Sequence, residues 1–149
     1  MLEVYTDGSC IGNPGPGGWA AAAVESSWEI SGGASHTTNN RMEMTAAIEA
    51  LRECDARGVR EARLWTDSSY LKQGITSWIH GWKTNGWRNS HGKPVKNDDL
   101  WKQIDALVDL VRVEWRWVKA HSASRGHAMN EKVDRLAYAE AVKRKDIPA

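Results

Sequence analysis

The sequence is poor in cysteine, lacks phenylalanine and carries almost no net charge. Only two cysteines, Cys10 and Cys54, occur among its 149 residues. Two cysteines do not make the disulfide framework of a small secreted scaffold, so a reducing, cytoplasmic location is the simpler expectation. The formal net charge is +1, so the total charge argues neither for nor against nucleic acid as a partner, and the distribution of charge has to be inspected instead.

Long apolar runs are also absent. No stretch approaches the roughly 20 apolar residues that a membrane-spanning helix needs, and the N-terminus has no signal-peptide pattern. With 41% hydrophobic and 26% charged residues, the chain has the composition of a soluble globular protein that can bury its own core. No linker, repeat or low-complexity segment divides it. We therefore predict a single domain over residues 1–149, a monomer that does not bind membranes.

Hydrophobic periodicity predicts the order of strands and helices. Alternating apolar and polar residues predict five strands, over 2–7, 19–24, 28–35, 62–66 and 113–117. Helical spacing predicts helices over 41–57, from 68, over 76–82, over 98–111 and over 130–145. Short connections between the first three strands indicate an antiparallel meander. The alternation of helices and strands that follows indicates an α/β fold in which helices cover a mixed sheet.

Four acidic residues stand where such a fold can bring them together. Asp7 and Asp67 each end a predicted strand with the same Thr-Asp-small-Ser pattern, and Asp7 is followed by the glycine- and proline-rich stretch 8–18. Open α/β sheets build sites at such strand ends. Glu43 lies in the first turn of a predicted helix, and Asp134 lies off the apolar stripe of the last one. Several converging carboxylates can hold two Mg²⁺ ions, which activate water and relieve charge during phosphodiester hydrolysis.

Each carboxylate also has a purely structural explanation. Asp7 before a glycine suits a turn, and Asp67 suits the N-cap of the next helix. The helix dipole alone favours Glu43 in a first turn, and Asp134 suits a solvated helix face. Taken singly, the structural explanation is the better one for Glu43 and Asp134 and equally good for Asp7 and Asp67. The combination, in this order and on this pattern of strands and helices, favours a metal-dependent enzyme.

Longer motifs support the same interpretation. In chain order they are YTDGSCIGNPGPGG at 5–18, TTNNRME at 37–43, TDS at 66–68, WIH at 78–80, KPVKN at 93–97, WRWVK at 115–119, and Asn130-Glu131 with Asp134. Together they span nearly the whole chain, and the chain resembles bacterial ribonuclease HI, of the type 1 ribonuclease H family. The resemblance implies a five-stranded mixed sheet flanked by helices, with the first three strands antiparallel and the fourth and fifth parallel to the first.

The resemblance also implies the chemistry. It implies an endonuclease that hydrolyses the RNA strand of RNA–DNA hybrids, leaves 5′-phosphate and 3′-hydroxyl ends, and acts in the removal of RNA primers and R-loops. The four carboxylates would be ligands of two Mg²⁺ ions, which Mn²⁺ can replace. His121, in the loop before the last helix, would assist catalysis. The stretch 121–130 is longer than is usual in the family and holds a second histidine, His127, so the choice between the two stays open, with His121 preferred.

Contacts to the hybrid follow from the same resemblance. A protein distinguishes RNA from DNA by the 2′-hydroxyl, and glycine-rich loops let a backbone approach nucleic acid closely. The predicted substrate contacts are Gly8, Cys10, Asn13, Thr38, Asn39, Asn40, Gln73 and Trp82. The asparagines also suit turns and caps. The basic, tryptophan-containing segment 78–97 would form a handle-like protrusion on the DNA strand, whereas Trp78 and Trp101 are predicted core residues.

Several positions depart from the family pattern. His36, Ser69 and Gly81 stand where arginine, glutamine and asparagine are usual, and Thr84-Asn85 replace basic residues of the handle. We therefore expect this chain to bind the hybrid more weakly, and with a stronger dependence on salt, than a typical relative does. Two other functions stay open: a nucleic-acid-binding module without catalysis, which would gain nothing from four converging acids, and a nuclease of the same fold superfamily with another substrate, against which the handle argues.

Overall fold

The computed structural model describes residues 1–25, 28–118 and 127–145. Its strands form one sheet of order β3-β2-β1-β4-β5. The strands are β1 (Leu2–Cys10), β2 (Gly15–Ala23), β3 (Glu29–Thr37), β4 (Glu61–Thr66) and β5 (Arg112–Trp117). β1, β2 and β3 are antiparallel neighbours, whereas β4 is parallel to both β1 and β5. The predicted mixed sheet and its antiparallel meander are confirmed.

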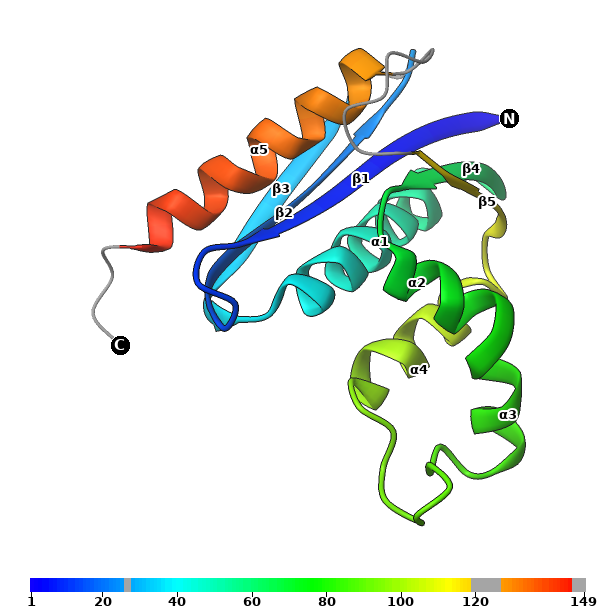
Figure 1. Ribbon diagram of the computed structural model, residues 1–149. Helices are drawn as coiled ribbons and strands as arrows, with labels where there is room; N and C mark the ends of the chain where they lie inside the picture. Colours follow the sequence, from blue (N-terminus) through cyan, green and yellow to red (C-terminus); the bar gives the residue numbers. More distant parts are fainter. Residues whose placement is uncertain (26–27, 119–126, 146–149) are drawn as a thin grey trace.

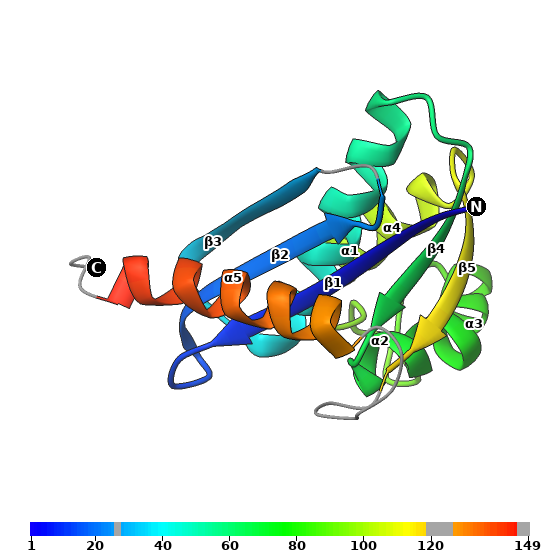
Figure 2. The ribbon, with the colours of Figure 1, turned by 90° about the horizontal axis from the view of Figure 1, so that it is seen from above.

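Helices cover both faces of this sheet (Figure 1). They are α1 (Asn39–Ala56), α2 (Ser69–Gln73), the π-helical turn η1 (Gly74–Trp78), α3 (Ile79–Thr84), α4 (Asp98–Leu107) and α5 (His127–Lys145). α1 and α4 lie on one face, and α5 lies along β1 and β2 on the other, as Figure 2 shows. Within the described ranges, none of these helices is long and apolar enough to cross a membrane.

Alternate side chains of β1 belong to two hydrophobic clusters, one on each face of the sheet. Val4 is fully buried on the side of α1, whose predicted apolar stripe, including Met44 and Leu51, is also fully buried. The neighbouring residue Tyr5 belongs to a smaller cluster under α5, together with Ala20 and other residues. Because successive side chains of a strand point to opposite faces, Asp7 lies on the same face as Tyr5, under α5.

Small residues bring α5 close to the sheet. A methyl group placed on Gly18 of β2 would lie 2.0 Å from the carbonyl oxygen of Ala137 in α5. No real side chain tolerates this distance, so the glycine is what lets helix and strand touch at this point. Asp134 lies three residues before Ala137, so this contact also fixes how far Asp134 stands above the sheet.

Three of the expected boundaries that were wrong concern the site. β1 does not end at Asp7, because residues 8–10 stay extended and pair with β2 up to Cys10↔Gly17. α1 begins two residues earlier than expected, capped by Thr38, so Glu43 lies in the second turn rather than the first. α5 begins at His127, so Asn130 lies inside the helix and does not cap it.

Candidate active site

The site lies where β4 separates from β1. The two strands pair in parallel only as far as Tyr5↔Trp65, while β1 continues along β2 for five more residues. Beyond Tyr5, in the part of the chain that the structure describes, no strand covers the β4 side of β1. Asp7 lies beside this gap, and Asp67 follows β4 directly. The parallel pair thus brings both aspartates to one opening, as expected for the carboxyl ends of neighbouring strands.

Gly8 brings the third carboxylate into the opening. A methyl group on Gly8 would lie 2.4 Å from the backbone nitrogen of Glu43 and 2.5 Å from the carbonyl carbon of Met42. α1 therefore touches β1 backbone to backbone, which only glycine permits. Because of this contact, Glu43 lies next to the uncovered edge of β1 and reaches Asp7, although α1 covers the opposite face of the sheet.

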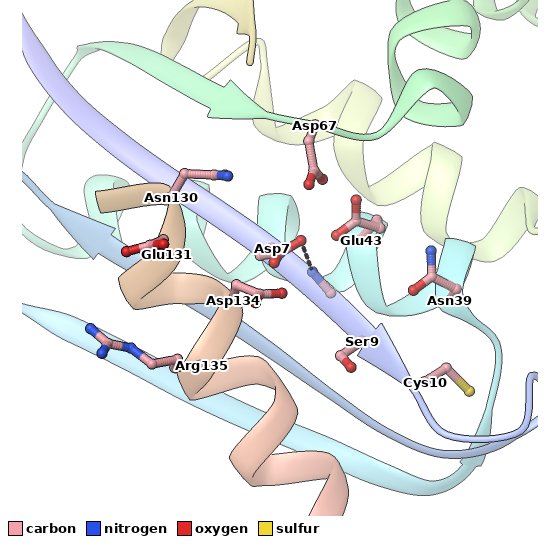
Figure 3. A pocket seen from close by; sticks show the side chains of 11 residues that line it. Asp7, Ser9, Cys10, Asn39, Glu43, Asp67, Asn130, Glu131, Asp134 and Arg135 are labelled. Atoms are coloured by element: carbon pink, nitrogen blue, oxygen red, sulfur yellow. Dashed lines mark hydrogen bonds between the residues drawn. The ribbon is translucent and has the colours of Figure 1, made fainter. Parts of the chain in front are cut away.

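Asp7, Glu43 and Asp67 form a compact cluster. Each offers one carboxylate oxygen, and these oxygens lie within 4.8 Å of one another. Figure 3 shows the three side chains turned toward one another from β1, α1 and the end of β4. Asp7 and Glu43 are each only 4% exposed, and Asp67 is half-buried. The backbone N–H of Gly8 donates to Asp7 Oδ1 over 2.9 Å, which fixes that carboxylate.

The cluster contains more negative charge than its surroundings neutralise. Burial, together with the nearby charge of Asp67, raises the pKa of Asp7 to about 8. Burial also raises the pKa of Glu43 well above its usual range, and the charges of both aspartates add to this effect. Glu43 Oε1 is buried and has no hydrogen-bond partner among the described residues. Converging hard oxygen donors with one oxygen unpartnered fit a divalent cation.

A polar pocket of about 480 Å³ surrounds the cluster. Its lining residues are Asp7, Gly8, Ser9, Cys10, Asn39, Glu43, Asp67, Asn130, Glu131, Asp134 and Arg135. Asp134 enters from α5 (Figure 3) and is exposed, and it lies outside the group of three carboxylates within 4.8 Å. The structure thus brings three of the four predicted ligands into one cluster and places the fourth at the wall of the same pocket.

Half of the predicted substrate contacts line this pocket or the one beside it. Gly8, Cys10 and Asn39 line it, and Asn40 lines an adjoining pocket of about 280 Å³ together with Glu43 and Asp67. Two more predicted residues organise the start of α1. The side chain of Thr38 accepts from the Arg41 N–H as the helix cap. Asn13 Oδ1 accepts from the backbone N–H of Asn39 over 3.0 Å.

Other predicted residues lie elsewhere. Gln73 is exposed at the end of α2, and neither pocket includes it. Trp82 is half-buried, and its ring packs at 5.6 Å from that of Trp101. Trp101 is fully buried, as predicted for a core residue. His121 lies outside the described residues, and of His127 only its place at the start of α5 is described.

Asn130 has a more specific place than the sequence indicated. It is 8% exposed, it lines the carboxylate pocket, and its Oδ1 has no hydrogen-bond partner among the described residues. The interval of four residues between Asn130 and Asp134 places both on one helix face. That interval was the available signal for Asn130. Ser9 and Glu131, which also line the pocket, lie within motifs found in the sequence, whereas Arg135 belongs to none of them.

The fold and the cluster together define an α/β enzyme with a candidate divalent-metal site at the opening of its sheet. The ribonuclease H family model matches residues 1–142. This chain therefore belongs to the ribonuclease H family, as its motifs predicted, and is a ribonuclease.

Individual relatives agree with this assignment. The ribonuclease H of Aeromonas salmonicida is 55% identical over 138 residues, which cover 91% of this chain and 86% of the relative. Among solved structures, LC9-RNase H1, a type 1 RNase H with the type 2 active-site motif, superposes with a TM-score of 0.82 at 34% identity, covering 96% of this chain and 72% of that one. LC11-RNase H1, solved in complex with an RNA/DNA hybrid, shares the fold with a TM-score of 0.73 at 20% identity, covering 96% and 98%.

Proposed function

We propose that this chain is an endoribonuclease that hydrolyses the RNA strand of RNA–DNA hybrids. The observation that carries the proposal is the cluster of Asp7, Glu43 and Asp67 within 4.8 Å. Membership of the ribonuclease H family supports it. A pure binding module would gain nothing from two buried acids that repel each other beside phosphate, so the cluster argues for catalysis rather than binding alone.

The four carboxylates Asp7, Glu43, Asp67 and Asp134 would hold two Mg²⁺ ions, which Mn²⁺ can replace. When bound, these ions would supply an activated water and stabilise the leaving 3′-oxygen. The chain itself sets the geometry: Gly8 lets Glu43 reach the opening, and the Gly8 N–H orients Asp7. His121 would assist proton transfer, since a histidine titrates near neutral pH.

The hybrid would lie across the pocket mouth and toward the loop that follows α3. Gly8, Cys10, Asn39 and Asn40 offer polar groups and closely approachable backbone beside the carboxylates, which suits the 2′-hydroxyls of an RNA strand. Gln73, Asn13 and Thr38, which line neither pocket, remain predicted contacts. The segment 78–97, here named the handle segment, would bind the DNA strand, with Trp82 as its aromatic contact. Figure 1 shows the loop between α3 and α4, which belongs to this segment, standing away from the sheet.

The test is cleavage of a labelled RNA–DNA hybrid in Mg²⁺ beside matched single-stranded RNA and duplex DNA. We expect cutting of the hybrid's RNA strand only, and loss of cutting in Asp67→Asn, which keeps the size of the side chain but removes its charge. Products should carry 5′-phosphate and 3′-hydroxyl ends, so DNA polymerase should extend them without prior treatment. Hybrid binding without cutting in both Mg²⁺ and Mn²⁺ would contradict the proposal and favour the binding module.

The proposed cellular setting follows from this activity. A cytoplasmic, monomeric enzyme of this specificity would remove RNA primers and R-loops. Size-exclusion chromatography with light scattering tests the oligomeric state: a mass near the 16.6 kDa of the chain is expected, and twice that mass would contradict it.

A further inference from the structure

A polar joint connects α1 to the start of α4, two residues before Glu43. The guanidinium of Arg41 in α1 donates to both carboxylate oxygens of Asp99 in α4, over 3.0 Å and 2.7 Å. A second hydrogen bond from Arg41 Nη1 reaches Asn97 Oδ1 over 3.1 Å. This two-pronged geometry is the strong, directional form of an arginine–carboxylate pair. The Arg41 guanidinium accordingly holds the pKa of Asp99 below its usual range.

Asn97 serves this joint instead of its own helix. It is the N-cap of α4, a position where an asparagine side chain normally accepts a hydrogen bond from the helix backbone. Here its side chain makes no capping hydrogen bond, and its backbone is left-handed with φ of 61°. Its Oδ1 accepts from Arg41, and its Nδ2 donates to the hydroxyl of Tyr70 in α2 over 3.1 Å. The side-chain amide of Asn97 therefore connects α1, α2 and α4.

Tyr70 connects the joint to both parts of the proposed binding surface. On one side it lines the small pocket that also contains Glu43 and Asp67. On the other, its ring lies 5.7 Å from that of Trp78 and 5.6 Å from that of Trp101. Trp78 begins the handle segment, and Asn97 ends it. Both ends of the segment are thus fixed to a network that begins on the helix carrying Glu43.

We propose that Arg41 and Asp99 are positioning residues that hold the handle segment at a fixed distance and angle from the carboxylate cluster. This inference rests on the proposed function, because it assigns a role in hybrid binding. A hybrid that contacts both the carboxylate pocket and the handle segment binds tightly only if the distance between these two places matches the distance between the parts of the hybrid that they contact. Loosening the joint should therefore weaken binding while leaving the cluster intact.

The test compares Asp99→Asn with wild type and with two matched controls. Asp98→Asn makes the same change one residue away, where, among the residues that the structure describes, the carboxylate pairs only within α4, with Lys102 at 3.5 Å. Gln103→Ala removes another α1–α4 contact, the 2.7 Å hydrogen bond from Arg52. Because a helix rises about 1.5 Å per residue, Arg52 lies about 16 Å along α1 from Arg41. Asp99→Glu restores the carboxylate and should recover most of the loss.

Five quantities are measured: the dissociation constant, KM, kcat, the thermal midpoint and amide hydrogen exchange. For Asp99→Asn we expect the dissociation constant for a labelled hybrid in EDTA, and KM in Mg²⁺, to rise about fivefold or more, the low end of usual couplings between two sites. The kcat should stay near the wild-type value, and the thermal midpoint should match that of Asp98→Asn. Amide hydrogen exchange of the handle segment should quicken in Asp99→Asn and in neither control.

The outcomes separate this inference from the proposed function. Two outcomes would overturn the proposed positioning role of Arg41 and Asp99. One is unchanged amide exchange of the handle segment in Asp99→Asn, and the other is an equal loss of hybrid affinity in Asp99→Asn, Asp98→Asn and Gln103→Ala. A fall in kcat without a rise in KM would also overturn it, since it would place the effect on the cluster. If the wild type neither binds nor cuts the hybrid, the proposed function fails, and the exchange data alone decide whether Arg41 and Asp99 hold the segment.

Discussion

Replacing Gly8 by alanine should separate Glu43 from the other two carboxylates. The added methyl group would lie 2.4 Å from the Glu43 nitrogen, whereas ordinary contacts begin at 3.4 Å. α1 must therefore retreat from β1 by about 1 Å, since both atoms in conflict belong to backbone and cannot rotate away. Overpacking of this kind costs about 1–3 kcal/mol of stability. For a chain of this size the thermal midpoint should fall by roughly 3–10 °C.

The effect on the site should exceed the effect on stability. A displacement of about 1 Å in a reacting constellation can cost ~100-fold in rate. For Gly8→Ala we expect a loss of that order in kcat/KM for hybrid cleavage at a temperature where the variant is folded. The Mg²⁺ concentration that gives half of the metal-dependent rise in thermal midpoint should also increase, which reports on the site without requiring activity.

Gly81→Ala is the matched control for this experiment. A methyl group on Gly81 meets nothing within 4 Å, and the residue lies in α3, where alanine is the better helix former by up to about 1 kcal/mol. It should leave the Mg²⁺ titration unchanged and not lower the thermal midpoint. If Gly8→Ala gives the same Mg²⁺ titration as Gly81→Ala and the same kcat/KM as wild type, then the contact between β1 and α1 does not position Glu43, and the reasoning fails.

Three further predictions follow from charge and packing. The pKa of Asp7 is about 8 in the folded protein and about 3.9 in the unfolded chain. Between these values the unfolded chain has lost the proton that the folded protein keeps, so the stability of the metal-free protein falls as the pH rises from about 3.9 to about 8. Denaturant unfolding in EDTA should therefore show Asp7→Asn more stable than wild type at pH 8 and nearly equal at pH 4; a constant difference would contradict this. The double variant His36→Arg, Gly81→Asn should bind the hybrid more tightly than wild type across a salt titration, and no gain in affinity would contradict the expectation that these two positions weaken binding. Gly18→Ala should lower the thermal midpoint by several degrees, since its methyl group would lie 2.0 Å from the Ala137 carbonyl oxygen; an unchanged midpoint would refute the need for close packing of α5.

The sequence by itself determined the order of elements and the identity of the acids. Alternation along 2–7 and 62–66 predicts two strands that bring Asp7 and Asp67 to strand ends, because hydrophobic periodicity is local. The parallel direction of these strands followed from the family resemblance. The apolar stripe of α1 was equally readable, since it depends only on helical spacing. Family motifs along the chain then identified these acids as one set, which no single motif could do.

Only the tertiary structure decided how the acids meet. Asp7 lies within a strand, not at its end, and the opening exists because β4 departs after Trp65 while β2 does not. Glu43 reaches the opening because Gly8 touches α1, a contact between residues 35 positions apart that no local pattern encodes. The buried place of Asn130 and the joint at Arg41 have the same origin. Local patterns fix which residues share a face, but distances between faces are set by packing, in which side chains from distant segments have to fit one another.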